Sequence, residues 1–224
     1  MKYKATYSNQ NKFIWFQVNK AASSSIYHAL IQNAKLVPNE DYFEHIDFLN
    51  KKKKYPELNK YSATDDFPPD LVKLMRPLYE HQVDNETLNT LKFKKTYFSF
   101  SFVRNPWSRL VSYYNAGFKN KNTTSFSEYL KEITKTENLY SHPHYKPQTS
   151  CIPPNTLDFI GKVENFDKDF NSICNNINIP QQTSIHLNKS KHKHYTEYYD
   201  RKDRDLIAEV YKDDIEMFGY KFED

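Results

Sequence analysis

The sequence predicts an α/β fold of three layers, in which a mainly parallel central sheet is flanked by helices. Short apolar runs of strand length alternate along the chain with segments whose apolar residues recur at helical spacing. Aromatic residues provide the core, because they make up 16% of the 224 residues and each one buries a large apolar area. A chain of this length is typical of one domain, so we expect a single domain over residues 1–224.

The first strand, turn and helix are predicted near the N-terminus. Residues 13–18, FIWFQV, form an almost unbroken apolar run whose length and aromatic content favour a buried strand. Residues 19–25 make a polar turn. The apolar spacing of residues 26–31 then predicts a helix that ends before Pro38.

A second strand followed by a helix is predicted in the middle of the chain. Residues 97–103, YFSFSFV, favour a strand, and Asn105 and Pro106 suit the N-cap and the first turn of the helix that follows. Gly219 suits the end of the last helix. The same criteria predict one more short strand, at 157–161, and three more helices, at 126–133, 166–177 and 203–218.

The composition excludes several kinds of site and scaffold. The three glycines cannot be arranged as the glycine-rich phosphate loop of a Rossmann or Walker motif. The two cysteines could form one disulfide, but they are too few for a disulfide scaffold or a four-cysteine zinc site. The net charge of +4 allows a local basic pocket, but it excludes a histone-like excess of positive charge.

The hydrophobic pattern predicts a soluble, intracellular protein, with the cytoplasm as its location. No apolar run approaches the roughly 18 residues that a transmembrane segment needs. The N-terminal residues, MKYKATYSNQNK, lack the apolar stretch of a signal peptide.

Two segments carry residues that could bind phosphate, and the first is the turn of residues 18–25, VNKAASSS. A strand end, small residues and a helix start would gather backbone N–H groups around one point, where Lys20 adds a full positive charge. The hydroxyls of Ser23, Ser24 and Ser25 could donate to oxygens. This pattern favours a P-loop-like site for phosphate or another tetrahedral oxyanion. The alternative is an ordinary serine-rich N-cap beside a surface lysine.

The second segment follows the second predicted strand. Arg104 stands at the exit of that strand, and Ser112 comes eight residues later, about two turns into the helix. An arginine can contact phosphate through two N–H groups at once, which a lysine cannot do. The alternative is that Arg104 pairs with a carboxylate and that Ser112 faces solvent.

Together, the two segments resemble the two nucleotide-binding motifs of the PAPS-dependent sulfotransferases. Residues 20–25, KAASSS, resemble the loop that cradles the 5′-phosphosulfate. Residues 102–112, FVRNPWSRLVS, are especially similar to the membrane-type carbohydrate sulfotransferases. Residues 144–164 and 195–220 are similar to stretches of the chondroitin/HNK-1-like branch of that family.

The resemblance implies transfer of a sulfuryl group from 3′-phosphoadenylyl sulfate (PAPS) to a carbohydrate or glycolipid acceptor, which leaves adenosine 3′,5′-bisphosphate (PAP). It implies that Lys20 stabilises the charge that develops on the leaving phosphate. It also implies that Arg104 and Ser112 bind the 3′-phosphate, and the scheme needs no metal ion. The residues that it assigns to the donor are Lys20, Ala21, Ala22, Ser23, Ser24, Ser25, Arg104 and Ser112.

An acceptor hydroxyl has to lose a proton, so a general base is expected, and histidine suits that task near neutral pH. His81 is the first choice, because its place ahead of the second strand resembles that of the catalytic His in the uronyl 2-O-sulfotransferases. His144, in the segment HYKPQ, is the second choice, and His45 is the third. An amine acceptor, or Glu80 as the base, would exclude His81.

Other functions stay open at this point. A nucleotide kinase would need a glycine loop and a magnesium-binding Asp, and the missing glycines count against it. A non-catalytic module for nucleotides or polyanions would have the same phosphate site without a base. Nucleic-acid binding is disfavoured, because the net charge is modest and the aromatic residues lie at core spacing. The basic residues 186–194 could cover the donor or hold an anionic sugar; otherwise they form a solvated loop.

Overall fold

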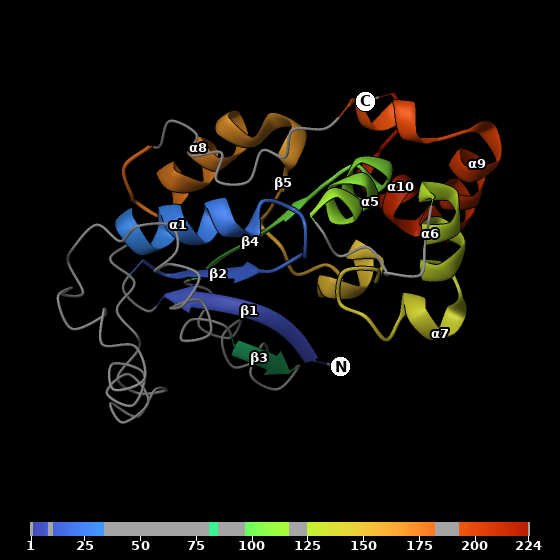
Figure 1. Cartoon of the computed structure of the whole chain (residues 1–224). Coiled ribbons are helices and arrows are strands. Elements are labelled where there is room, and N and C mark those ends of the chain that lie inside the picture. The colour runs from blue at the N-terminus through green and yellow to red at the C-terminus, as the bar shows by residue number, and fades with distance from the viewer. Residues whose placement is uncertain are drawn as a thin grey trace, which may run out of the picture.

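The computed structural model of the chain describes residues 2–8, 11–33, 81–84, 97–116, 125–181 and 193–223. Strands and helices follow one another along the chain, as Figure 1 shows. The strands are β1 (Lys2–Ser8), β2 (Phe13–Phe16), β3 (His81–Asp84), β4 (Phe98–Val103) and β5 (Phe159–Lys162). The α-helices are α1 (Ser23–Asn33), α5 (Pro106–Asn115), α6 (Phe126–Ile133), α7 (Thr136–Leu139), α8 (Phe166–Asn176), α9 (Arg201–Val210) and α10 (Lys212–Phe218). Short 3₁₀ helices are η3 (Gln148–Cys151), η4 (Val163–Asn165) and η5 (Tyr195–Tyr198).

The strands form one mixed sheet in the order β3-β1-β2-β4-β5. The pairs β2–β4 and β4–β5 are parallel, whereas β1 is antiparallel to both of its neighbours. Strand β3 therefore runs in the same direction as β2, β4 and β5, and β1 alone among the described strands runs against them. This arrangement, with helices flanking the sheet, confirms the predicted α/β fold with a mainly parallel sheet.

Helices α1 and α8 cover one face of the sheet (Figure 1). Their apolar side chains pack on Trp15 of β2 and on Phe100 and Phe102 of β4. The opposite face carries a smaller cluster from β1 and β2: Tyr3, Ala5, Ile14 and Phe16. The alternation of Ile14 and Trp15 between the two faces follows from the two-residue repeat of a strand.

A second helical group lies beyond the carboxyl ends of β2 and β4, where Figure 1 shows α5, α6, α9 and α10 together. Its core is rich in aromatic residues, in agreement with the composition. Helix α5 begins as predicted, because the Asn105 side chain accepts hydrogen bonds from the N–H groups of Trp107 at 3.1 Å and Ser108 at 3.3 Å. Pro106 occupies the first turn of that helix.

The last part of the chain corrects one prediction. A single helix over residues 203–218 is wrong, because Tyr211, with φ −108° and ψ 28°, separates α9 from α10. The buried Tyr211 hydroxyl donates to the Tyr145 carbonyl at 2.6 Å, so a tertiary contact holds the residue at the break. Gly219 ends α10 in the left-handed conformation, with φ 63°, as predicted.

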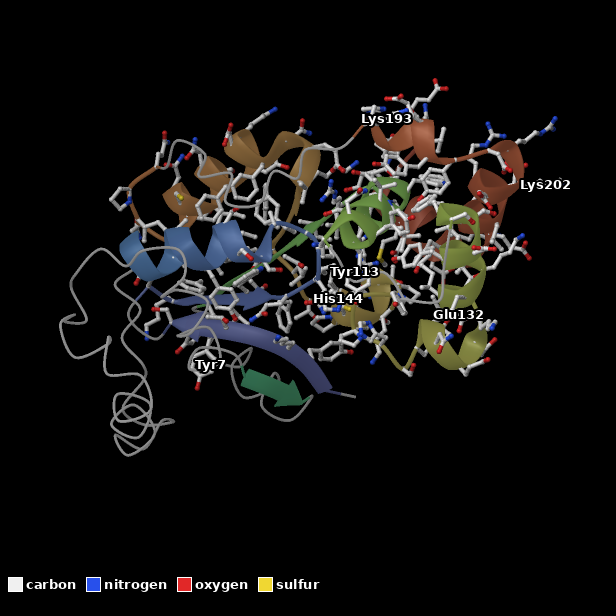
Figure 2. All side chains as sticks on the ribbon, viewed as in Figure 1. Tyr7, Tyr113, Glu132, His144, Lys193 and Lys202 are labelled. Carbon is white, nitrogen blue, oxygen red and sulfur yellow. The ribbon has the colours of Figure 1, made fainter. Side chains whose placement is uncertain are left out.

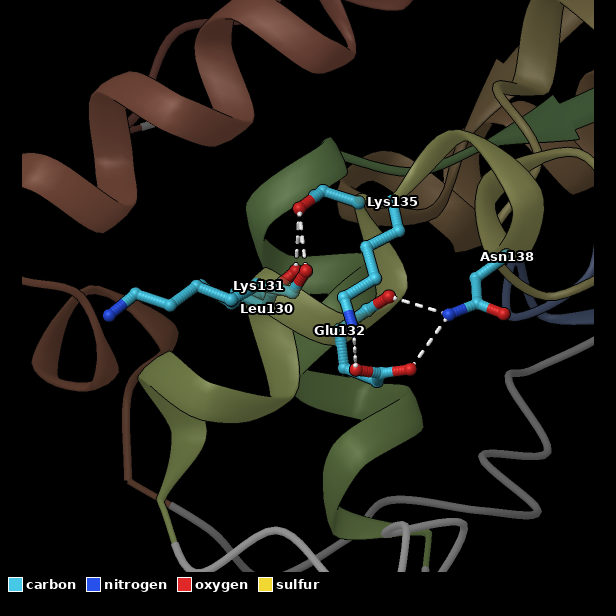
Figure 3. Close-up of polar contacts among 6 residues, drawn as sticks. Leu130, Lys131, Glu132, Lys135 and Asn138 are labelled. Atoms are coloured by element: carbon cyan, nitrogen blue, oxygen red, sulfur yellow. Dashed lines mark hydrogen bonds and ion pairs between the residues drawn. The ribbon is translucent and has the colours of Figure 1, made fainter.

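The corner between α6 and α7 is closed by polar contacts, which Figure 3 shows. The Asn138 amide donates to both the backbone carbonyl and the side chain of Glu132, at 2.9 Å each. The Lys135 ammonium bonds the same carboxylate at 2.6 Å and lowers its pKa.

No helix in the described part of the chain is long and apolar enough to cross a membrane.

Candidate active site

The loop that joins β2 to α1 has an unusual backbone. Lys20 and Ala22 adopt left-handed conformations, with φ 66° and φ 58°. Residues with a Cβ avoid this region at a cost of roughly 1–2 kcal/mol, so the surrounding contacts must hold the loop in place. The Ala21 N–H donates to the Val18 carbonyl at 3.3 Å, and the Ser23 hydroxyl donates to the same carbonyl at 2.9 Å. The loop thus makes a tight turn without glycine and starts α1 at Ser23.

Arg104 leaves the sheet beside this loop. Because β2 and β4 are parallel and Phe16 pairs with Ser101, Lys20 and Arg104 both follow strand ends at the same edge of the sheet. Ligands of open α/β sheets bind at this edge. Burial, and then the positive charge of Arg104, lowers the pKa of Lys20. The two cations predicted to share a site therefore lie close enough to influence each other.

The surroundings of Arg104 bring few negative charges close to it. Burial lowers its pKa, whereas the nearby carboxylate of Glu164 acts in the opposite direction. The Glu164 oxygens accept hydrogen bonds from the Asn105 N–H at 2.8 Å and the Tyr220 hydroxyl at 3.2 Å. Within the described residues, no carboxylate forms an ion pair with Arg104 or Lys20. An anionic ligand would offset the cost of these desolvated charges.

Ser108 is a site residue that the sequence analysis missed. The Arg104 Nε atom donates to the Ser108 hydroxyl at 3.0 Å. Ser112 lies half-buried one turn later on the same face of α5, since residues four apart in a helix are neighbours. The two serines therefore follow Arg104 along one side of the helix. The spacing of four residues between Arg104 and Ser108 was the available signal.

Arg109, which the sequence analysis also missed, connects two parts of the site. Only 1% of this residue is exposed. Its Nε atom donates to the Asn19 carbonyl at 3.0 Å, and its Nη2 atom donates to the His144 carbonyl at 3.1 Å. The Asn19 amide also donates to the Pro143 carbonyl at 3.0 Å. The loop that carries Lys20 is therefore held next to the segment that carries His144.

The structure describes the predicted histidines in different detail. His144 is half-buried, and its ring stacks on that of Tyr113 with centroids 4.5 Å apart (Figure 2). For His81 the structure describes the backbone alone: it pairs with Ala5 of β1, which in turn pairs with Phe16 of β2. His81 therefore begins β3 at the level of the carboxyl end of β2. His45 and most of the basic segment, residues 182–192, lie outside the described residues.

The two cysteines lie in the part of the chain that the structure describes. Cys151 and Cys174 are both free thiols, so the disulfide that the sequence left open is not formed. Burial raises the pKa of both, that of Cys174 to about 11. Among the residues whose placement is described, no group of three His, Cys, Asp or Glu side chains could hold a metal ion.

Comparison with known proteins assigns the family. A protein of Archaeoglobus fulgidus that carries the name "Uncharacterized protein" is 28% identical to this chain over 104 residues, which cover 44% of the chain and 82% of that protein. Residues 3–221 match the model of a family described as "Sulfotransferase family". That match extends from β1 to beyond the end of α10 and includes both the Lys20 loop and Arg104. The chain therefore belongs to the sulfotransferase family.

Proposed function

We propose that the protein transfers the sulfuryl group of PAPS to a hydroxyl of a carbohydrate or glycolipid acceptor. The observation that carries the proposal is that Lys20 and Arg104 follow neighbouring parallel strands at the same edge of the sheet, close enough for the charge of Arg104 to influence Lys20. Two desolvated cations at one sheet edge suit a ligand with two separate anionic groups. A doubly phosphorylated adenosine is such a ligand.

The residues present fit this donor. The loop with its two left-handed residues leads directly into the N-terminus of α1, where the helix dipole adds partial positive charge. Lys20, Ser24 and Ser25 would hold the 5′-phosphosulfate there, whereas the Ser23 hydroxyl already donates to the Val18 carbonyl and shapes the loop. Arg104 and Ser112 would bind the 3′-phosphate. The bound donor supplies an activated sulfuryl group, and PAP is its leaving group.

Lys20 has the properties that the departing phosphate requires. Its lowered pKa means that the protonated form is destabilised in the free protein. Negative charge that develops beside the ammonium group would relieve this destabilisation, so the interaction grows stronger as the reaction proceeds. An interaction of this kind lowers the activation barrier and does not merely tighten binding.

A general base would remove the proton of the acceptor hydroxyl. His81 and His144 are the two candidates for this base. Support for His144 comes from Arg109, which binds the carbonyls of both His144 and Asn19. Support for His81 comes from the resemblance and from its register position beside the end of β2. The carbohydrate nature of the acceptor rests on the resemblance of residues 102–112.

The direct test is to incubate the purified protein with radiolabelled donor and a panel of glycans and glycolipids. We expect label on at least one acceptor, and we expect neither Lys20→Ala nor Arg104→Ala to transfer it. Binding of PAP without transfer to any acceptor would point to a non-catalytic binding module. Transfer from ATP in place of PAPS would overturn the assigned chemistry.

A further inference from the structure

The Gln148 side chain makes two hydrogen bonds to the backbone of one residue of the candidate site. Its side-chain Nε2 atom donates to the Arg104 carbonyl at 2.8 Å, and its Oε1 atom accepts from the Arg104 N–H at 2.9 Å. The carboxamide thus occupies both backbone groups of Arg104, as a neighbouring strand would. Strand β4 ends at Val103, so Gln148 replaces the ladder partners that Arg104 would otherwise lack.

Gln148 is itself held by a buried carboxylate. Asp214, in the first turn of α10, is 0% exposed, and so is Gln148. The Asp214 carboxylate accepts from the Gln148 N–H at 2.8 Å, and from the Thr149 N–H at 2.9 Å and hydroxyl at 3.0 Å. Three donors satisfy this buried carboxylate, which explains how it is tolerated in the core. Helix α10 therefore fixes η3, and η3 fixes Arg104.

The fixed backbone of Arg104 also restricts where its side chain can lie. With its backbone held on both sides, its Nε atom bonds Ser108 at 3.0 Å and leaves the rest of the guanidinium for other partners. A cation that is already oriented loses less conformational entropy when it binds an anion. A bidentate contact to phosphate depends on that orientation.

We infer that Gln148 is a positioning residue, which orients Arg104 for the 3′-phosphate of the donor, with Asp214 as its support. This inference rests on the proposed function, because it assigns Arg104 to that phosphate. Gln148 then determines the preference for a 3′-phosphorylated adenosine over one that lacks this group. It acts through Arg104 and makes no contact with the ligand.

The test compares the affinities of PAP and adenosine 5′-monophosphate by isothermal titration calorimetry. The ratio of the two affinities isolates the contribution of the 3′-phosphate. An unfolded fraction of the sample would weaken both apparent affinities by the same factor, so it would leave this ratio unchanged. We expect Arg104→Ala to remove most of the preference and Gln148→Ala to lower it by about tenfold or more. The matched control is Gln181→Ala, an exposed glutamine whose amide bonds Asn175, and it should keep the wild-type ratio.

The double variant shows whether Gln148 acts through Arg104. If it does, adding Gln148→Ala to Arg104→Ala changes the ratio by less than about twofold, because the two effects are not additive. If Arg104→Ala keeps the preference, the proposed donor site is wrong. If Arg104→Ala loses the preference and Gln148→Ala keeps it, the donor site stands and the role of Gln148 is refuted.

A second variant keeps the test decisive if Gln148→Ala does not fold. Asp214→Asn has the same shape, but one of its side-chain atoms is a donor that faces the N–H groups of Gln148 or Thr149. We expect a smaller decrease of the affinity ratio in the same direction. A wild-type ratio in folded Asp214→Asn would contradict the proposed support of Gln148 by α10.

Discussion

Burial, and after it the charge of Arg104, lowers the pKa of Lys20, although Lys20 and Arg104 follow different strands of the sheet. This relationship exists because β2 and β4 are parallel neighbours, so both chains leave the sheet at the same edge. Two cations in that position disfavour one another until an anion binds. The candidate site is therefore electrostatically unfavourable without its ligand. This cost should affect both the stability of the free protein and the number of protons taken up on binding.

Replacing Lys20 should stabilise the free protein and abolish transfer. The folded-state pKa of Lys20 is below that of the unfolded chain, so the penalty is fully present at pH values below the lowered pKa. It decreases as the pH rises toward the ordinary value for lysine, because the unfolded chain then loses its proton as well. We expect Lys20→Met to raise the unfolding midpoint near neutral pH, as thermal denaturation would show. A lower midpoint would indicate that Lys20 has a stabilising partner.

Binding of PAP should be accompanied by proton uptake. An anion beside Lys20 raises its pKa back toward the ordinary value, so the complex holds more protons than the free protein at pH values between the two. Calorimetry in buffers of different ionisation enthalpy measures this number of protons. We expect the uptake to disappear in Lys20→Met. Equal uptake by the variant would assign the effect to another group.

Replacing the general base should lower the turnover number and leave the affinity for the donor nucleotide unchanged. If His144 removes the acceptor proton, His144→Ala lowers kcat by about 100-fold or more and leaves the Kd for PAP nearly unchanged. The same result with His81→Ala would assign the role to His81. Gln181→Ala is again the control, since Gln181 is exposed, bonds Asn175 and has no assigned role in the site. Wild-type turnover in both His81→Ala and His144→Ala would exclude the two candidates.

Arg109 should be essential for stability as well as for the site. Arg109→Met would leave the carbonyls of Asn19 and His144 without their donor, at a cost of about 2–4 kcal/mol. Urea denaturation measures this loss. Arg201→Met is a suitable control, because Arg201 is exposed on α9. A loss below roughly 0.5 kcal/mol would mean that the loop and the His144 segment stay in place without Arg109.

Gly161 within β5 and Gly219 at the end of α10 should respond differently to replacement by alanine. A Cβ at Gly161 would lie 2.6 Å from Cε1 of the Phe102 ring, so Gly161→Ala should cost about 1–3 kcal/mol through overpacking. Gly219 has open space around it but a φ of +63°, so Gly219→Ala should cost about 1–2 kcal/mol through backbone strain. Gly219→Asn should cost less, since Asn tolerates this conformation, whereas Gly161→Asn should be worse than Gly161→Ala. Equal losses for the two asparagine variants would contradict this explanation.

Local patterns predicted a large part of the fold. The apolar run of β2, the N-cap of α5 at Asn105 and the left-handed stop at Gly219 are confirmed, because each depends on neighbouring residues alone. Strand β1 was missed, since Lys2–Ser8 is too polar to form an apolar run and is recognisable by its pairing with β2 and β3. The break at Tyr211 was missed because the contact with Tyr145 that holds it is distant in sequence.

In the candidate site, too, the residues with a local sequence signal were predicted and those that depend on tertiary contacts were not. Lys20 and Arg104 were recognisable from short motifs, because a charged residue after a buried strand is a local signal. Four residues contribute to the site only after folding: Ser108, Arg109, Gln148 and Asp214. Each acts through hydrogen bonds to residues outside its own helix. A side chain that supports a site carries no distinctive pattern in the chain. Its role depends on which backbone groups the packed elements bring within about 3 Å of it.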